Sequence, residues 1–329
     1  MPSLVEAAIG LLTRQDDGSN DPSDSSYGYL PTESICIMFL VLFSLSTGMS
    51  IHTGQATYYR MWWLFPSVIL GGLGEILGWS GRLWSNRNLD LETPFMIEIS
   101  TTIMSPTFIL AANFIIFGRM IDYLGTGYSR LPARLYSRIF ISCDVISLVV
   151  QGAGGGVASA ATTHDGANLG AHIMLGGIVF QFVIISLYAA LATEFLIRYT
   201  RDNPFTGRTN SSSRTQMTPR TRIMLGALGF NTLCLFIRAI YRIIELSDGW
   251  SGRIIRTQIY FNVLDGGMVI LAIYTFNFIH PGMFLPQRPS TVDGLEMGRT
   301  PLYIENKNKV VRSGYTPVAN LTATASNLN

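Results

Sequence analysis

The sequence predicts an all-α membrane protein, built as a bundle of seven transmembrane helices. Seven long apolar stretches alternate with short polar segments, and each stretch has close to the ~20 residues that a helix needs to cross the bilayer hydrocarbon. Charged residues make up 13% of the chain, whereas roughly 25% is usual for globular proteins. Backbone groups in lipid must be paired within their own segment, so each stretch is predicted to be a helix.

The predicted spans leave little sequence for a second domain. They cover residues 31–51, 62–79, 95–117, 139–161, 169–197, 223–244 and 259–279. The remaining loops and tail hold too few apolar residues for a separate core. We therefore expect one seven-helix domain over residues 31–282, preceded by an extracytoplasmic segment of residues 1–30 and followed by a disordered cytosolic tail of residues 283–329.

The positive charges predict the orientation of the bundle. Of the 23 Arg and Lys residues, 16 lie in the first, third and fifth loops and the C-terminal tail, and 5 lie on the opposite side. Short cytoplasmic loops carry an excess of Arg and Lys. The N-terminus is therefore predicted outside the cell and the C-terminus in the cytosol.

Residue types that the spans lack argue against several classes of function. The only lysines, Lys307 and Lys309, lie in the tail, so the spans hold neither a phosphate-binding loop nor a lysine for a retinal Schiff base. The four histidines are divided between the two membrane faces without metal-ligand spacing. A net charge of +2 gives no reason to expect a nucleic-acid partner. We expect a protein that is not an enzyme and has no metal or other cofactor.

Ionisable residues within the spans are the first candidates for a functional site. Such a group costs several kcal/mol unless it is paired or faces water. The candidates recur at helical spacing on one face of the second, sixth and seventh spans. They are Glu75 and Arg82, then Arg238, Tyr241, Arg242 and Glu245, and finally Asp265. With Glu98 and His172, which are predicted at the same depth in the outer half of the membrane, they predict one buried network.

Two interpretations of this network are open. In the first, the charges only pair with each other and lock the second, sixth and seventh helices together. In the second, they line a polar cavity, open to the outside, that receives the head group of an amphiphile while its tail stays near lipid.

Polar residues also continue below this network. Asp144 and Gln151 share one face of the fourth span, and Gln181 lies midway along the fifth. Gln181 is predicted either to hydrogen-bond another helix or to contact a ligand. Asp144 has no arginine in its own span, which makes it either a hydrogen-bonded structural group or a proton carrier. Pro106 in the third span frees a backbone carbonyl.

The order and spacing of these residues resemble one known family. The motifs are Glu75-x-x-Gly78-x-x-x-Arg82, Pro106 with Ala111-Ala112 and Arg119, Asp144 with Gln151-Gly152-x-Gly154-Gly155, Gly177-x-x-x-Gln181, Arg238-x-x-Tyr241-Arg242-x-x-Glu245, and Asp265. The chain is similar to the fungal RTA-like family of seven-helix lipid-translocating exporters. The resemblance covers nearly the whole predicted membrane domain. Trp79 stands where the family often has Tyr.

The resemblance implies a function and a location. It implies efflux or leaflet exchange of amphiphilic lipids or hydrophobic toxicants, most often at the plasma membrane, with a membrane lipid or amphiphile as the partner. Arg238 and Arg242 would then face anionic groups, and Glu75, Asp144 and Asp265 would face amines. The alternative is a seven-helix sensor that binds an amphiphile and signals to cytosolic partners through its Arg-rich third and fifth loops.

Overall fold

The computed structural model describes residues 29–48, 52–88, 91–205, 215–248 and 252–285. All of them belong to one compact unit, Met1–Pro286. A second unit, Gln287–Asn329, lies outside the described residues. The predicted disorder of the tail and the predicted N-terminal segment therefore stay predictions.

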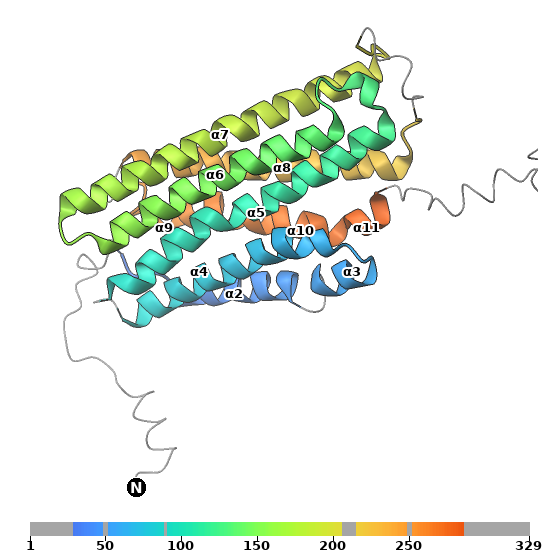
Figure 1. The fold of residues 1–329 in the computed structure, drawn as a ribbon. Helices are drawn as coiled ribbons and strands as arrows, with labels where there is room; N and C mark the ends of the chain where they lie inside the picture. The colour runs from blue at the N-terminus through green and yellow to red at the C-terminus, as the bar shows by residue number, and fades with distance from the viewer. Residues whose placement is uncertain (1–28, 49–51, 89–90, 206–214, 249–251, 286–329) are drawn as a thin grey trace, which may run out of the picture. The chain divides into compact units, whose positions relative to one another are not determined.

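Helices and turns account for the described residues, which include no β-strand. The long helices are α4 (Leu70–Arg87), α5 (Glu92–Leu124), α6 (Ala133–Ala160), α7 (His164–Thr200) and α8 (Pro219–Ser247). The short ones are α2 (Glu33–Thr47), α3 (His52–Tyr58), α9 (Gln258–Tyr260), α10 (Met268–Phe278) and α11 (Pro281–Phe284). Two π-helical segments, η3 (Phe65–Ile69) and η5 (Phe261–Gly267), lead directly into α4 and α10. Figure 1 shows the course of the chain. The predicted all-α class is confirmed.

Six helical segments of the described chain are long and apolar enough to cross a membrane. They are Trp62–Arg87, Glu92–Leu124, Ala133–Ala160, Asp165–Thr200, Pro219–Ser247 and Gln258–Phe278. The first predicted span, residues 31–51, contains the shorter helix α2, which ends at Thr47 before Gly48 turns to extended backbone. Its 15 residues extend about 22 Å, less than the ~30 Å of bilayer hydrocarbon. The count of seven spans therefore stays a prediction.

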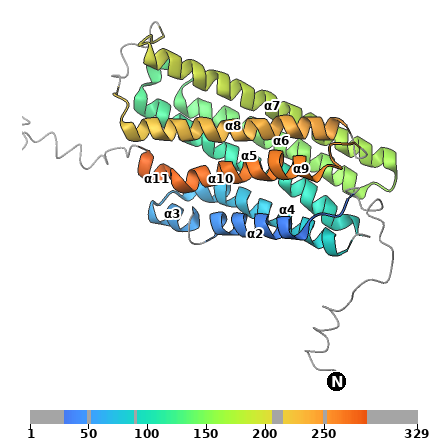
Figure 2. The ribbon, with the colours of Figure 1, turned by 180° about the vertical axis from the view of Figure 1, so that it is seen from behind.

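The helices of the unit Met1–Pro286 pack with α5 against α4, α6 and α8. Figure 2 shows α8 between α7 and α10, with α2 next to α10. The α6–α7 contact is close because Gly154 lies against the backbone of α7, where an added Cβ would stand 2.6 Å from the Met174 nitrogen. Small residues at such contacts let helix backbones approach each other in membranes. The side chains on α5 and α8 are thereby held between neighbouring helices.

Candidate functional site

An ion-pair network centred on Arg242 lies between α4, α5, α8 and η5. The Arg242 Nε and Nη2 donate to the two carboxylate oxygens of Asp265 at 3.0 and 2.8 Å. Its Nη1 donates to Glu245 at 2.7 Å, and Nη2 also donates to the Thr102 hydroxyl at 2.8 Å. Tyr241 donates its hydroxyl proton to the other oxygen of Glu245 at 2.7 Å. Arg242 therefore has an acceptor at each of its three nitrogens, although it is 1% exposed.

Arg238 completes the contact between α8 and α5. Its Nη2 donates to the backbone carbonyl of Thr102. Its Nε lies 2.8 Å from Oδ1 of Asp265, which is close enough for an ion pair. The Nε–H bond is not aimed at this oxygen, so the contact is not a hydrogen bond. Pro106 has no N–H to donate to the carbonyl four residues earlier, which is that of Thr102. The carbonyl that Pro106 was predicted to free is thus the acceptor for Arg238.

Arg82 forms a second ion pair in the same network. Its Nη1 donates to Glu98 at 3.0 Å and its Nη2 donates to the Tyr29 hydroxyl. The ring centroid of Phe261 lies 4.3 Å from the Arg82 guanidinium carbon and 5.1 Å from that of Arg242, which allows cation–π attraction to both. Tyr29 precedes the first helix, and burial raises the pKa of its hydroxyl although Arg82 opposes the shift.

Glu75 differs from the other acids of the network because it has no hydrogen bond within the described chain. It is fully buried, and neither carboxylate oxygen has a hydrogen-bond partner there. It interacts electrostatically with Asp265, Arg238 and Arg242. The network therefore brings together three arginines and four acids, namely Arg82, Arg238 and Arg242 with Glu75, Glu98, Glu245 and Asp265. If every group is charged, the four carboxylates exceed the three guanidinium groups by one. Glu75 is the carboxylate whose oxygens can still accept a hydrogen bond.

A π-helical segment positions the Asp265 carboxylate. Asp265 lies in η5, and the next residue, Gly266, packs closely on α4, since an added Cβ would lie 2.6 Å from the Trp79 ring. The π-helix changes the number of residues per turn and occurs often at functional sites. Asp265 is thereby buried opposite Arg242 rather than exposed to the surroundings.

A second polar cluster lies where α5, α6 and α7 meet. The Gln151 amide donates to the Ser147 hydroxyl at 2.7 Å and to the Gln181 carbonyl oxygen at 3.0 Å. Gln181 donates in turn to the Thr107 hydroxyl at 2.9 Å, and Ser147 donates to the Gly177 backbone carbonyl at 2.7 Å. These bonds confirm that Gln181 makes an inter-helix hydrogen bond.

Asp144 lies beside this second cluster. It is 2% exposed, the Gln181 side chain is near it, and neither of its oxygens makes a hydrogen bond of normal geometry among the described residues. A cavity of about 20 Å³ is lined by both Gln181 and Arg238, and a water needs roughly 10–15 Å³. The cavity therefore borders both clusters and has room for one water.

The structure thus sorts the predicted site residues into two groups. Seven of them lie in the network, namely Glu75, Arg82, Arg238, Tyr241, Arg242, Glu245 and Asp265, and three lie in the second cluster, namely Asp144, Gln151 and Gln181. Their roles toward a substrate stay predictions. The inclusion of His172 in the network was wrong, because its side chain is exposed on α7.

Sequence reasoning missed three residues of the network, namely Tyr29, Thr102 and Phe261. Phe261 shows no signal beyond its neighbourhood to Asp265. Thr102 does, because it precedes Pro106 by four residues and its carbonyl is the one that loses its helical partner.

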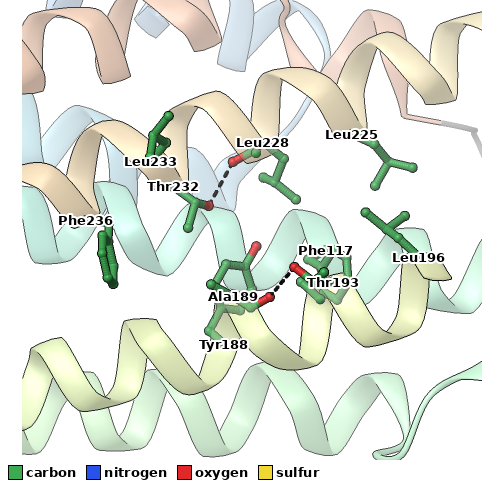
Figure 3. Close-up of a pocket in the computed structure, with 12 residues that line it drawn as sticks. Phe117, Tyr188, Ala189, Thr193, Leu196, Leu225, Leu228, Thr232, Leu233 and Phe236 are labelled. Atoms are coloured by element: carbon green, nitrogen blue, oxygen red, sulfur yellow. Dashed lines mark hydrogen bonds between the residues drawn. The ribbon is translucent and has the colours of Figure 1, made fainter.

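An apolar groove of about 300 Å³ lies between α7 and α8, near the end of α7 and the start of α8 (Figure 3). Tyr188 and Leu196 line it from α7, Leu225 and Leu228 from α8, and Phe117 from α5. The two threonines of its wall, Thr193 and Thr232, donate to carbonyls of their own helices at 2.7 and 2.8 Å. Both threonine hydroxyls therefore already donate a hydrogen bond to their own helix. The surface that lines the groove is mainly apolar.

Comparison with known proteins places this arrangement in a family. The family model described as "RTA1 like protein" matches residues 68–288. The "Sphingoid long-chain base transporter RSB1" of Saccharomyces cerevisiae is 27% identical over 319 residues, which cover 89% of this chain and 82% of that protein. In the same yeast, "Protein RTA1" is 27% identical, with 78% and 84% covered, and "Protoporphyrin uptake protein 1" is 24% identical, with 76% and 90% covered.

No solved structure matches this protein. The family match covers more than half of the sequence and agrees with the resemblance in the span residues. Together with the six membrane-length helices, it shows that the chain is a multi-pass membrane protein that belongs to the family of RTA1-like proteins.

Proposed function

We propose that this protein transports amphiphilic lipids, either by export or by exchange between the two leaflets, and thereby gives resistance to toxic amphiphiles. The single observation that carries the proposal is a charged network buried among membrane-length helices, in which neither Glu75 oxygen has a hydrogen bond from the described residues. An ionisable group in such a place is a functional hypothesis by default. The printed names of two relatives, a sphingoid long-chain base transporter and a protoporphyrin uptake protein, support the same class of cargo.

The pairing within the network suggests which groups would meet a head group. Arg242 has its acceptors in Asp265, Glu245 and Thr102, so it would hold the network together. Glu75 is available to a protonated amine, because a carboxylate without hydrogen bonds gains a charge-assisted bond from such a donor. Of the two arginines on α8, Arg238 is the better candidate for an anionic group, since its contact with Asp265 is not aligned.

We further propose the orientation that the Arg and Lys distribution predicts. The first apolar stretch would also cross the membrane and so bring the number of spans to seven. The N-terminus would be outside the cell, and the C-terminus and its regulatory contacts would be cytosolic. The network would then lie in the outer half of the plasma membrane and the α7–α8 groove in the inner half. An epitope at the C-terminus should resist external protease in intact cells, while one near Gly18 should be cleaved. Cleavage of the C-terminal epitope would reverse the assignment.

Transport by the purified protein in liposomes tests the proposed function. The unaltered protein should move a labelled long-chain base between leaflets without any partner, and Glu75→Gln should move it more slowly at equal abundance and equal thermal midpoint. Protein-free liposomes supply the background rate. Saturable binding of the amphiphile with no movement above that background would favour the sensor interpretation and end the transport proposal.

A further inference from the structure

The groove between α7 and α8 is open along one side. At its rim, Leu233 is 53% exposed, and Thr193 and Gly229 are also exposed. Its inner wall is buried and includes Phe117 and Leu228. On a helix within a membrane, an exposed apolar rim meets lipid chains rather than water. An alkyl chain could therefore enter the groove sideways from the bilayer.

The dimensions of the groove fit one chain. Its volume of about 300 Å³ is at the lower end of the ~300–1,000 Å³ usual for ligand pockets. Its lining on α8 runs from Leu225 to Phe236, a length of about 16 Å along the helix. A single unbranched chain is long and narrow in this way, whereas a two-chain lipid is not. Tyr188 borders the space from α7 and Phe236 borders it from α8 (Figure 3).

The Asp144 carboxylate lies one helical turn from a residue that packs on the wall of this groove. The Phe140 ring on α6 is 5.9 Å from the ring of Tyr188, and Asp144 follows Phe140 by one helical turn. Both oxygens of Asp144 lack a hydrogen bond of normal geometry within the described chain, where only the Gln181 side chain is near them, and the residue is buried. A protonated amine would supply the missing donors and the counter-charge. An apolar slot with such a carboxylate behind its wall matches a single-chain amphiphile that carries an amine.

We propose that the α7–α8 groove holds the alkyl chain of such an amphiphile and that Asp144 receives its protonated amine. The inference rests on the proposed function and adds a binding site for the cargo, separate from the network around Glu75. In the proposed orientation the groove opens toward the inner leaflet, so this site would load the cargo from that leaflet.

Two glycines on α8 allow a matched test of the chain site. A Cβ added at Gly229 or at Gly226 would meet nothing within 4 Å, and both positions are exposed, but only Gly229 lines the groove. The probe is a long-chain primary amine with a diazirine at the end of its chain, added to the purified protein in phosphatidylcholine liposomes. Gly229→Trp should bind the probe roughly tenfold more weakly, because the indole would displace about two methylenes of the probe's chain from the groove. Gly226→Trp should bind the probe with normal affinity. Equal labelling of the two variants, or labelled peptides outside α5, α7 and α8, would overturn the chain site.

The amine site is tested with a second probe. Asp144→Asn should lower the affinity for the amine probe roughly tenfold, whereas its affinity for the corresponding long-chain alcohol should stay unchanged. An equal effect on both probes, or none on either, would refute the role of Asp144.

The binding assays separate this inference from the proposed function. If the unaltered protein moves the amine but Gly229→Trp binds and moves it as Gly226→Trp does, the groove is excluded while transport stands. If the unaltered protein moves nothing, transport fails, and the labelling result still decides whether the groove binds the chain.

Discussion

Replacement of Asp265 by asparagine tests whether the network holds the helices together. Asp265 on η5 accepts two hydrogen bonds from Arg242 on α8, at 3.0 and 2.8 Å, and lies 2.8 Å from Arg238. Asparagine has nearly the same shape but no charge, and its amide nitrogen cannot accept a hydrogen bond. Asp265→Asn therefore removes one of the two hydrogen bonds that Asp265 accepts from Arg242 and one of the two carboxylates paired with Arg242, with almost no change in the volume of the side chain.

The expected effect is large because the pair is buried. Asp265 is 0% exposed and Arg242 is 1% exposed, so solvent screens the lost attraction little. Removing one partner of a buried ion pair costs about 3–5 kcal/mol. For a large domain, with about 2 °C of thermal midpoint per kcal/mol, this corresponds to a decrease on the order of 6–10 °C.

Thermal unfolding of the detergent-solubilised protein measures this decrease, and Glu75→Gln is the matched control. Both changes turn a buried carboxylate of the same network into an amide, but Glu75 has no hydrogen bond to lose within the described part of the chain. Its midpoint should change by less than about 2 °C, or roughly 1 kcal/mol. Two results would contradict this reasoning: an unchanged thermal midpoint for Asp265→Asn, or an equal decrease of the midpoint in both variants. Asp265 would then have no special structural role, and Glu75 would not be a carboxylate without a structural contact.

Three further changes test separate parts of the fold. Pro106→Ala restores the N–H that the helix lacks, so the thermal midpoint should rise. Transport should decrease, because Arg238 then shares the Thr102 carbonyl with this N–H. A lower midpoint would contradict this reasoning. Phe261→Leu removes the ring between two guanidinium groups and should cost about 1–3 kcal/mol in unfolding free energy; an unchanged midpoint would exclude cation–π stabilisation. His280 is buried, which lowers its pKa to about 4, and its Nδ1 accepts from the Gly282 nitrogen. The unfolded histidine binds a proton near pH 6.5, so stability should decrease as the pH falls from about 6.5 to 4, by up to roughly 3 kcal/mol. Asparagine at position 280 can still cap the helix, so His280→Asn should show a weaker pH dependence; an identical dependence would exclude this histidine.

The sequence by itself determined the class of fold and most of the charged residues that the structure buries together. Apolar length predicted helices because lipid leaves backbone groups no other partner, and all six spans after the first appear in the structure. Helical spacing placed Arg238, Tyr241, Arg242 and Glu245 on one face, and all four are buried together. The first span was harder to predict, because composition does not show that α2 stops at Thr47.

Only the tertiary structure decided which groups pair. Spacing within one helix gives the face of a residue, but it does not give the rotation and depth of the neighbouring helices, on which every inter-helix hydrogen bond depends. His172 was placed in the network by depth alone and is exposed, because its face of α7 points away from the other helices. Glu75 and Asp265 look alike in the sequence, yet only Asp265 has a bidentate arginine partner. That difference arises from the packing of η5 and α8, because a hydrogen bond needs its two atoms within about 3 Å and in line.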